Sequence, residues 1–206
     1  MMIDNTYKVS SEIVLPDGWQ FIDFERFYKY KNLKKVKLPN TILHIDDRAF
    51  CKCSSLEEIN IPEGATIIRE SAFSGCTSLE NIDLPDSITL IDNYAFENCN
   101  SLKSITIPKS IETMGDNVFC KCSSLEDVII SSGVKKVYCG SFCGCINLKN
   151  VKLPDSLKMI ENSAFSDCSS LENIDIPKNV KIIGRDAFKN CTSLKNINMS
   201  DSVVII

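Results

Sequence analysis

The chain has 206 residues, of which 44% are hydrophobic and 24% charged, and its formal net charge is −4. This mild acidity argues against nucleic acid as a partner, and no apolar run is long enough to insert into a membrane. The opening, MMIDNTYKVSSEIVLP, lacks the basic, apolar and small-residue order of a signal peptide. The sequence alone therefore predicts a folded, cytoplasmic protein, or one whose leader is absent from this chain.

Residues 1–26 are expected to form an N-terminal cap and a partial repeat. Ile13, Leu15 and Ile22 fall in register with the later repeats, while roughly the first nine residues lie outside the pattern. Five bulky residues are expected to cover the first coil: Trp19, Phe21, Phe24, Phe27 and Tyr28. A basic group follows beside Glu25: Arg26, Lys29, Lys31, Lys34, Lys35 and Lys37. It is either a solvated cap, which we favour, or a site for an acidic protein or polyanion.

Residues 27–206 repeat about eight times with a period of 23 residues. The phenylalanines mark the register: Phe27, Phe50, Phe73, Phe96, Phe119, Phe142, Phe165 and Phe188. Leucine follows six residues later, Val or Ile nine later, and Leu, Ile or Met eleven later. The stretch SAFSGCTSLENIDLP at residues 71–85 returns as SAFSDCSSLENIDIP at residues 163–177, with three of fifteen positions changed. Such a period predicts a stack of coils in one domain, residues 1–206.

Within one repeat the sequence predicts a strand, a turn, a second short strand and a helical segment. Leu79, Ile82 and Leu84 give an alternating pattern that Pro85 ends. Residues 88–91 predict the second extended segment. Residues 92–98 are expected to form one to two helical turns, capped by Asp92 or Asn93. Because a single coil cannot bury its apolar side chains alone, neighbouring coils must stack and pair their strands into one parallel sheet.

The pattern resembles the BspA-like subclass of leucine-rich repeats. The match is seen in IPKNVKIIGRDAFKNCTSLKNI, residues 176–197, and the resemblance covers about residues 10–206. It implies an α/β fold: a right-handed solenoid with a parallel sheet on one face and short strands and helical turns on the other. Family members are common on bacterial and protozoan cell surfaces and are generally thought to bind macromolecules, which implies a cell-surface or secreted protein.

The cysteines do not form a recognisable reactive site. Seven of them follow the phenylalanines by three residues and are expected to be small buried side chains. Four lie off this register: Cys51, Cys120, Cys139 and Cys143. Cys120 and Cys143 occupy equivalent positions in adjacent coils, so the alternatives there are a disulfide, a metal site or free thiols, and we favour free thiols. His44 is the only histidine and is expected to be exposed. No catalytic motif is present, so we expect no catalytic residue, cofactor or metal.

The positions that the period leaves variable predict a ligand-binding face. Residues eight and ten after each phenylalanine should point away from the core. These candidate ligand-binding residues are Lys35, Lys37, Glu58, Asn60, Asn81, Asp83, Ser104, Thr106, Asp127, Ile129, Asn150, Lys152, Asn173 and Asp175. In leucine-rich repeats generally this face is the usual ligand surface. The sequence therefore predicts a non-catalytic module that binds a protein or glycan ligand.

A structural role is the alternative. The last residues, DSVVII, end halfway through a coil, and Val203 and Ile206 fall at core positions. We expect that the natural protein is longer, that another molecule covers this coil, or that the end frays. The protein would then be a monomer, or would associate end to end through its C-terminal coil as a spacer in a larger assembly.

Overall fold

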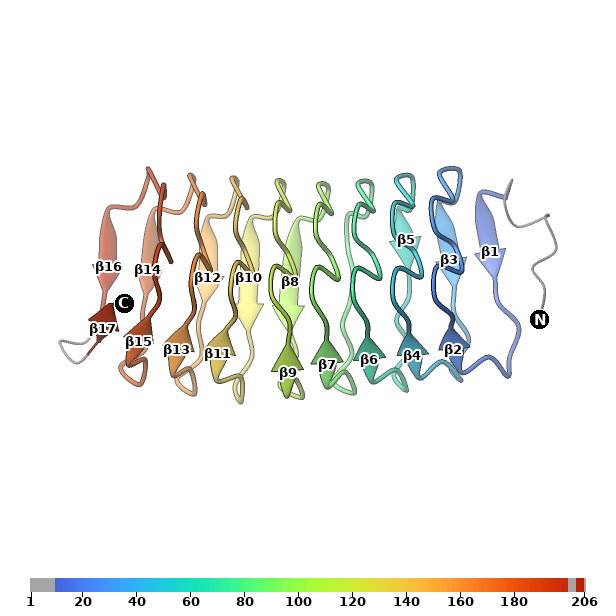
Figure 1. The fold of residues 1–206 in the computed structure, drawn as a ribbon, viewed down its shortest axis with the longest axis horizontal. Helices are drawn as coiled ribbons and strands as arrows, with labels where there is room; N and C mark the ends of the chain where they lie inside the picture. Colours follow the sequence, from blue (N-terminus) through green and yellow to red (C-terminus); the bar gives the residue numbers. More distant parts are fainter. Residues whose placement is uncertain (1–9, 200–202, 206) are drawn as a thin grey trace.

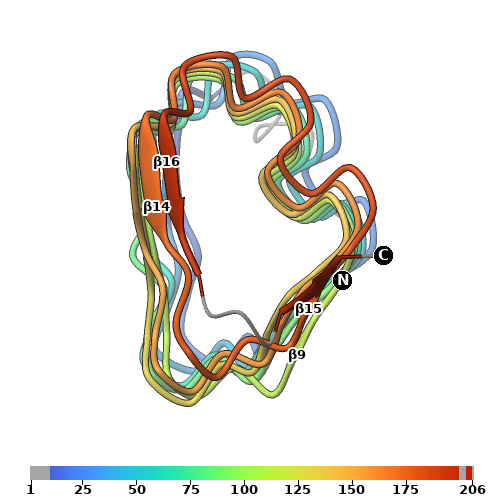
Figure 2. The same ribbon diagram turned by 90° about the vertical axis from the view of Figure 1, so that its left-hand side faces the viewer.

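The computed structural model describes residues 10–199 and 203–205, which form a stack of coils with a strand on each of two sides (Figures 1 and 2). The first strand row contains β1 (Glu12–Val14), β3 (Lys35–Lys37), β5 (Glu58–Ile59), β8 (Ser104–Ile107), β10 (Asp127–Ile130), β12 (Asn150–Lys152), β14 (Asn173–Asp175) and β16 (Asn196–Asn198). The second strand row contains β2 (Phe21–Ile22), β4 (His44–Ile45), β6 (Ile67–Ile68), β7 (Leu90–Ile91), β9 (Thr113–Met114), β11 (Lys136–Val137), β13 (Met159–Ile160), β15 (Ile182–Ile183) and β17 (Val204–Ile205).

Parallel pairing in both rows follows the predicted register. Lys35 lies opposite Glu58, and Asp127 lies opposite both Ser104 and Asn150, each one repeat away. The pair β15 and β17 departs from it, because Ile183 lies opposite Ile205, one residue short of the period. The predicted core position Ile206 lies outside the described residues.

The prediction of one continuous parallel sheet is wrong. The first strand row is divided into three sheets, β1-β3-β5, β12-β10-β8 and β14-β16. Residues 81–84 adopt no strand, and β12 and β14 are neighbours without a ladder between them. Strands of two to four residues make few hydrogen bonds with each neighbour, so a small change in coil orientation removes the whole ladder at one boundary.

A column of stacked phenylalanines forms the centre of the core. Their ring centroids lie 5.1–5.7 Å apart between successive coils, and the rings are inclined by 4–12°. The leucine six residues later is fully buried from Leu33 to Leu171. Offset stacks of this kind add a specific contact to the burial of a large apolar surface.

The predicted helical turns are absent, and the described residues contain no helix. In residues 92–99 the amides of Ala95 and Glu97 donate to the carbonyls of Asp92 and Tyr94 and so close four-residue β-turns. The amides of Tyr94 and Phe96 donate to the next coil. Tyr94 and Asn98 both have a φ of 59°, in the left-handed region. A helix needs right-handed residues throughout, so this alternation replaces it with consecutive β-turns.

The same geometry recurs in every coil, because the residues two before and two after each phenylalanine have positive φ. The prediction that Asp92 or Asn93 caps a helical turn is therefore wrong. The Asn93 side chain accepts a hydrogen bond from the amide of Asp116 in the next coil, at 2.8 Å. It therefore joins two coils and caps no helix.

The expected aromatic cover of the first coil is only partly formed. Phe27 is buried in the phenylalanine column, and Trp19 packs against the core. Phe21 and Phe24 are 41% and 60% exposed. Phe21 instead lies beside His44, with ring centroids 5.2 Å apart, and His44 is half-buried.

Candidate ligand-binding face

All fourteen candidate ligand-binding residues are exposed. Eleven lie in strands of the first strand row, whereas Asn60, Asn81 and Asp83 occupy equivalent positions of their coils outside a strand. The alternation is clearest in β10, where Asp127 and Ile129 point outward on either side of the buried Val128. Ile129 is 44% exposed, as expected for a strand-face position. Exposure is confirmed for these residues, whereas their role in binding stays a prediction.

Several of these side chains are bound to the equivalent residue of a neighbouring coil, which the sequence did not predict. Lys35 and Glu58 form an ion pair at 3.1 Å, and Asn150 Nδ2 donates to Asp127 Oδ1 at 2.7 Å. Further amide ladders join Asn173 to Asn196 and Asp175 to Asn198. Asn60 bonds the backbone of Leu38. The remaining seven make no side-chain hydrogen bond or ion pair with a described residue: Lys37, Asn81, Asp83, Ser104, Thr106, Ile129 and Lys152.

A charge ladder runs along the edge of the same face, seven residues after each phenylalanine. It consists of four ion pairs of 2.8–3.0 Å: Lys34–Glu57, Lys103–Glu80, Lys149–Glu126 and Lys195–Glu172. The hydrogen bond from Lys103 lowers the pKa of Glu80, and the bond to Glu126 raises the pKa of Lys149. Every repeat has lysine or glutamate at this position, and adjacent repeats carry opposite charges except at Glu57 and Glu80. That pattern was the signal available in the sequence.

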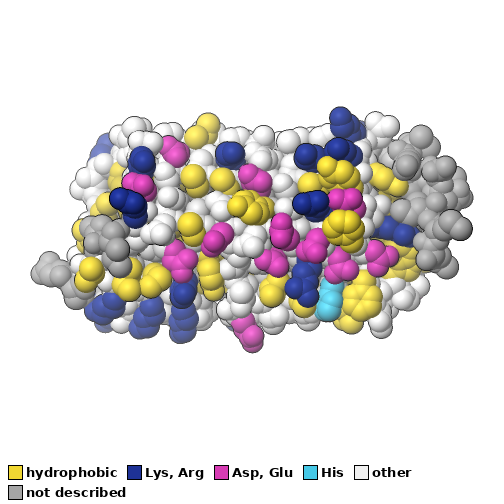
Figure 3. Space-filling view, in the orientation of Figure 1, with side chains coloured by type: hydrophobic (Ala, Val, Ile, Leu, Met, Phe, Trp, Pro, Cys, Tyr) yellow, Lys and Arg dark blue, Asp and Glu magenta, His cyan; other side chains and the backbone are white. Residues whose placement is uncertain are grey.

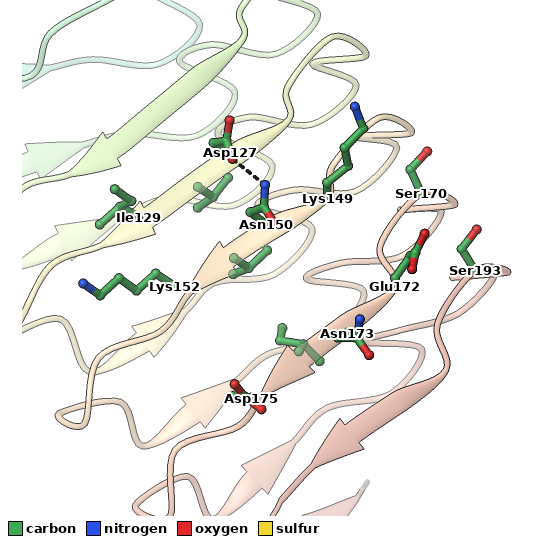
Figure 4. Close-up of a pocket in the computed structure, with 13 residues that line it drawn as sticks. Asp127, Ile129, Lys149, Asn150, Lys152, Ser170, Glu172, Asn173, Asp175 and Ser193 are labelled. Atoms are coloured by element: carbon green, nitrogen blue, oxygen red, sulfur yellow. Dashed lines mark hydrogen bonds between the residues drawn. The ribbon is translucent and has the colours of Figure 1, made fainter.

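A groove opens where β12 and β14 separate (Figure 4). It encloses about 800 Å³ and is lined by residues of β10, β12 and β14 and of the segments that precede β12, β14 and β16. Six candidate ligand-binding residues line it: Asp127, Ile129, Asn150, Lys152, Asn173 and Asp175. Ser170, Glu172 and Ser193 complete the wall on the C-terminal side. The structure thus gathers part of the predicted face into one concave site, while Lys35 and Lys37 lie far along the stack.

Positively and negatively charged side chains and the exposed Ile129 line this groove. Asp127 accepts from Asn150, and Glu172 is paired with Lys195, so these carboxylates are held in place. Lys152 and Ile129 are opposite one another across the β10–β12 pair. Such a surface can offer a cation, hydrogen-bond acceptors and an apolar contact to one ligand.

The seven cysteines in register act as hydrogen-bond donors, which the sequence did not reveal. Each thiol donates to the carbonyl oxygen of the phenylalanine in the preceding coil, with Sγ–O distances of 2.9–3.3 Å. Burial raises the pKa of Cys53 to about 12 and that of Cys99 well above its usual value. These thiols therefore stay protonated and contribute to packing.

The cysteines off the register are free thiols in the structure. Burial, and then the neighbouring Cys143, raise the pKa of Cys120 to about 12. Burial also raises the pKa of Cys139 and Cys143. The alternative of a disulfide between Cys120 and Cys143 is not realised, as the preference for free thiols predicted. No cluster of metal-binding side chains occurs in residues 10–199 and 203–205.

The N-terminal basic group is largely engaged within the molecule. Lys34 and Lys35 are paired with Glu57 and Glu58. Arg26 lies over the ring of Trp19 at 4.7 Å, and Lys29 lies over Tyr28 at the same distance. This geometry favours the solvated cap over a polyanion site.

Family comparison identifies the chain. The sequence matches the BspA type leucine rich repeat region over residues 5–126 and 112–206, with six copies of the repeat. The chain belongs to this family. Such repeat solenoids are typically surface proteins that take part in protein interactions. No curated protein is similar enough to be counted as a relative.

Three solved structures are similar over most of the chain. The leucine-rich repeat protein of T. pallidum is 33% identical, with a TM-score of 0.73, and the match covers 78% of each chain. A leucine-rich repeat protein of Bacteroides ovatus is 26% identical, with a TM-score of 0.66, over 94% of this chain and 70% of that one. A leucine rich cell surface protein of Faecalibacterium prausnitzii is 29% identical, with a TM-score of 0.60, over 93% of this chain.

The match covers only 60% of the Faecalibacterium prausnitzii chain, so this chain corresponds to part of that protein. In the part of the chain that the structure describes, no helix is long and apolar enough to cross a membrane.

Proposed function

We propose that the protein is a non-catalytic binding module that recognises a protein ligand through the groove between β12 and β14. The interruption of the first strand row carries this proposal, because it creates a concave site among residues that the repeat pattern leaves variable. The cell-surface protein among the similar structures supports a location at the cell surface.

The groove suits a protein ligand because it combines different kinds of contact. Ile129 offers an exposed apolar side chain, Lys152 a cation, and Asp175 a carboxylate within the same groove. Protein interfaces combine an apolar centre with a polar rim in this way. The interlocked coils hold these groups in a preformed arrangement, which reduces the ordering cost of association.

The test begins with a capture experiment. The immobilised protein is exposed to source-cell lysate and to a panel of extracellular proteins and glycans. The affinity of the captured protein is then measured for Ile129→Ser and Lys152→Glu. We expect each to weaken binding by roughly tenfold, since single interface residues often contribute more than 1 kcal/mol.

Two control variants carry comparable chemical changes away from the groove. Val14→Ser removes an apolar side chain of β1 that is 68% exposed, and Lys178→Glu reverses an exposed lysine outside the first strand row. Both should bind within about twofold of the unmodified protein. Equal affinity of all four variants, with unchanged melting temperatures, would contradict the proposal.

A second candidate function is structural, as a spacer that associates with another copy. It is favoured by Ile197 and Met199, which are 36% and 45% exposed and line an apolar cavity of about 270 Å³ with Phe188. Light scattering would then show dimers or longer chains that Ile197→Lys with Met199→Lys converts to monomers. A concentration-independent monomer would rule this function out.

A further inference from the structure

The outer face of the second strand row is apolar in its N-terminal half. We define the apolar strip as the outward residues of β2, β4, β6 and β7 together with the residue before β4: Phe21, His44, Ile67, Leu90 and Leu43. Phe21 and Leu43 are 41% and 37% exposed, and the other three are half-buried. Phe21, His44, Ile67 and Leu90 lie on successive rungs of one five-stranded sheet, so the strip is unbroken.

An acidic band lies beside the apolar strip, over the same coils. The positions three and four residues before the first five phenylalanines hold six acids and one base: Asp23, Asp46, Asp47, Glu70, Asp92, Asp116 and Arg69. The equivalent positions of the last three coils hold only Glu161 and Arg185 as charged residues. Figure 3 shows acidic side chains gathered across the N-terminal half of this face, near hydrophobic side chains and the histidine.

Much of the negative charge of the acidic band is available to a partner. Four of its acids are exposed and form no ion pair with a described residue: Asp23, Asp47, Glu70 and Asp116. Arg69 is half-buried, and the exposed Arg48 nearby is already paired with Glu25 at 3.3 Å. Among the described residues these acids form no metal-binding cluster. The band therefore suits several separate cationic side chains better than a single metal ion.

We infer that the apolar strip and the acidic band together bind a basic amphipathic helix of another protein. Successive rungs of the sheet are about 4.8 Å apart. Along an α-helix, residues three and four apart advance by about 4.5 and 6.0 Å, so a helix lying along the stack places an apolar side chain near each rung. Its basic flank then faces the acidic band.

The spacing favours a helix over an extended peptide. An extended chain presents side chains on one face about every 6.7 Å, which is out of step with the rungs. The helix comes from another protein, because the described residues of this chain contain none. The acidic band repels nucleic acid and anionic membranes, so it selects a partner that carries positive charge.

A designed peptide tests this inference. It carries leucines three and four residues apart, which form one apolar face of a helix, and lysines along one flank. We expect it to bind the intact protein with an affinity that falls as salt is raised. The same peptide with glutamates in place of the lysines should not bind. A scrambled peptide of equal composition, which has no apolar face, should bind roughly tenfold more weakly.

Variants of the protein assign the peptide to this surface. Asp47→Asn with Glu70→Gln removes two charges of the acidic band, and Asp47→Asn keeps the side-chain oxygen that accepts the amide of Glu70. Leu43→Ser removes an apolar side chain of the strip. The double variant and Leu43→Ser should each weaken binding by roughly fivefold or more, with unchanged melting temperatures.

Matched changes at exposed positions away from this surface provide the controls. Glu12→Gln with Asp155→Asn removes the same charge, and Val14→Ser removes an exposed aliphatic side chain. Both controls should bind the peptide within about twofold of the unmodified protein.

Four results would overturn the inference. These are the absence of peptide binding at low salt, equal binding of the scrambled peptide, and equal weakening by the band variant and its control. The fourth is a dimer in light scattering that Asp47→Asn with Glu70→Gln converts to a monomer, which would make a second copy of the chain the occupant. The groove lies on the first strand row, so this inference does not depend on the proposed function.

Discussion

At the scale of single residues, the buried thiols show how one small side chain can serve both packing and hydrogen bonding. Cys99 is fully buried, and its thiol donates to the carbonyl of Phe73 at 3.3 Å. That carbonyl also accepts the amide of Cys76. The cysteine thus ties the turn of one coil to the phenylalanine of the coil before it, at a site where an apolar residue would leave a weaker connection.

The raised pKa values of these buried thiols predict that the folded protein loses stability at alkaline pH. Burial raises the pKa of Cys99 in the folded protein above the usual value of 9.0. Below about pH 8 both states keep the proton, and the thiol makes no pH-dependent contribution. As the pH rises above 9, the unfolded chain releases its proton while the folded protein keeps it. The free energy of unfolding then falls by about 1.4 kcal/mol per pH unit for each such thiol.

Urea denaturation at pH 8 and pH 10 measures this effect. Cys99→Ala retains every other titrating group and should show a smaller decrease between the two pH values. An identical decrease in both proteins would show that the buried thiols do not cause the alkaline instability.

At the scale of the elements, the turn segment explains why a helix was expected and is not found. Residues 92–98 contain apolar residues after a candidate cap, Asp92 or Asn93, and this pattern resembles a short helix. The positive φ values of Tyr94 and Asn98 break that helix on either side of Phe96. The signal was present in the sequence, because Gly, Asn, Asp and Ser recur at these two positions, as at Gly140, Gly144 and Asn190.

The left-handed backbone predicts a position-specific response to a β-branched residue. Asn98→Val should lower the free energy of unfolding by roughly 1–2 kcal/mol, since its side chain clashes with the backbone in this conformation. Asn98→Gly should be close to neutral. Glu97→Val, at an adjacent turn residue without a positive φ, serves as the control. Equal losses for valine at both positions, measured by urea denaturation, would contradict this account.

At the scale of the whole molecule, the period of 23 residues predicted the stack, its register and nearly all of its core. Phe119, Leu125 and Val128 are buried where the pattern placed them. The same period does not predict that the first strand row is divided into three sheets. Residues 150–152 and 173–175 have similar strand patterns, yet β12 and β14 do not pair. The separation depends on the relative orientation of whole coils, which no single repeat specifies.

The stack also predicts that position along the axis determines the cost of a core substitution. Phe119 lies between two rings, at 5.2 Å and 5.7 Å, whereas Phe188 is half-buried and stacks on Phe165 alone among the described rings. Phe119→Ala should reduce the free energy of unfolding by roughly 3–5 kcal/mol, and Phe188→Ala by clearly less. Chemical denaturation of both variants provides the comparison, and equal losses would show that the described end is as tightly packed as the middle.

The hydrogen bonds between the β-turns of successive coils have a consequence for the evolution of such a protein. The β-turn segment of each coil presents the same backbone donors and acceptors to the neighbouring coils, so the turn hydrogen bonds of a complete inserted repeat can be satisfied at these boundaries. A gene encoding it can therefore lengthen or shorten by recombination in whole-repeat steps without unfolding the product. The near-identical stretches at residues 71–85 and 163–177 show that almost the same sequence serves two different positions of the stack. Each added coil would extend the surface available for new ligands while the existing sites keep their local geometry.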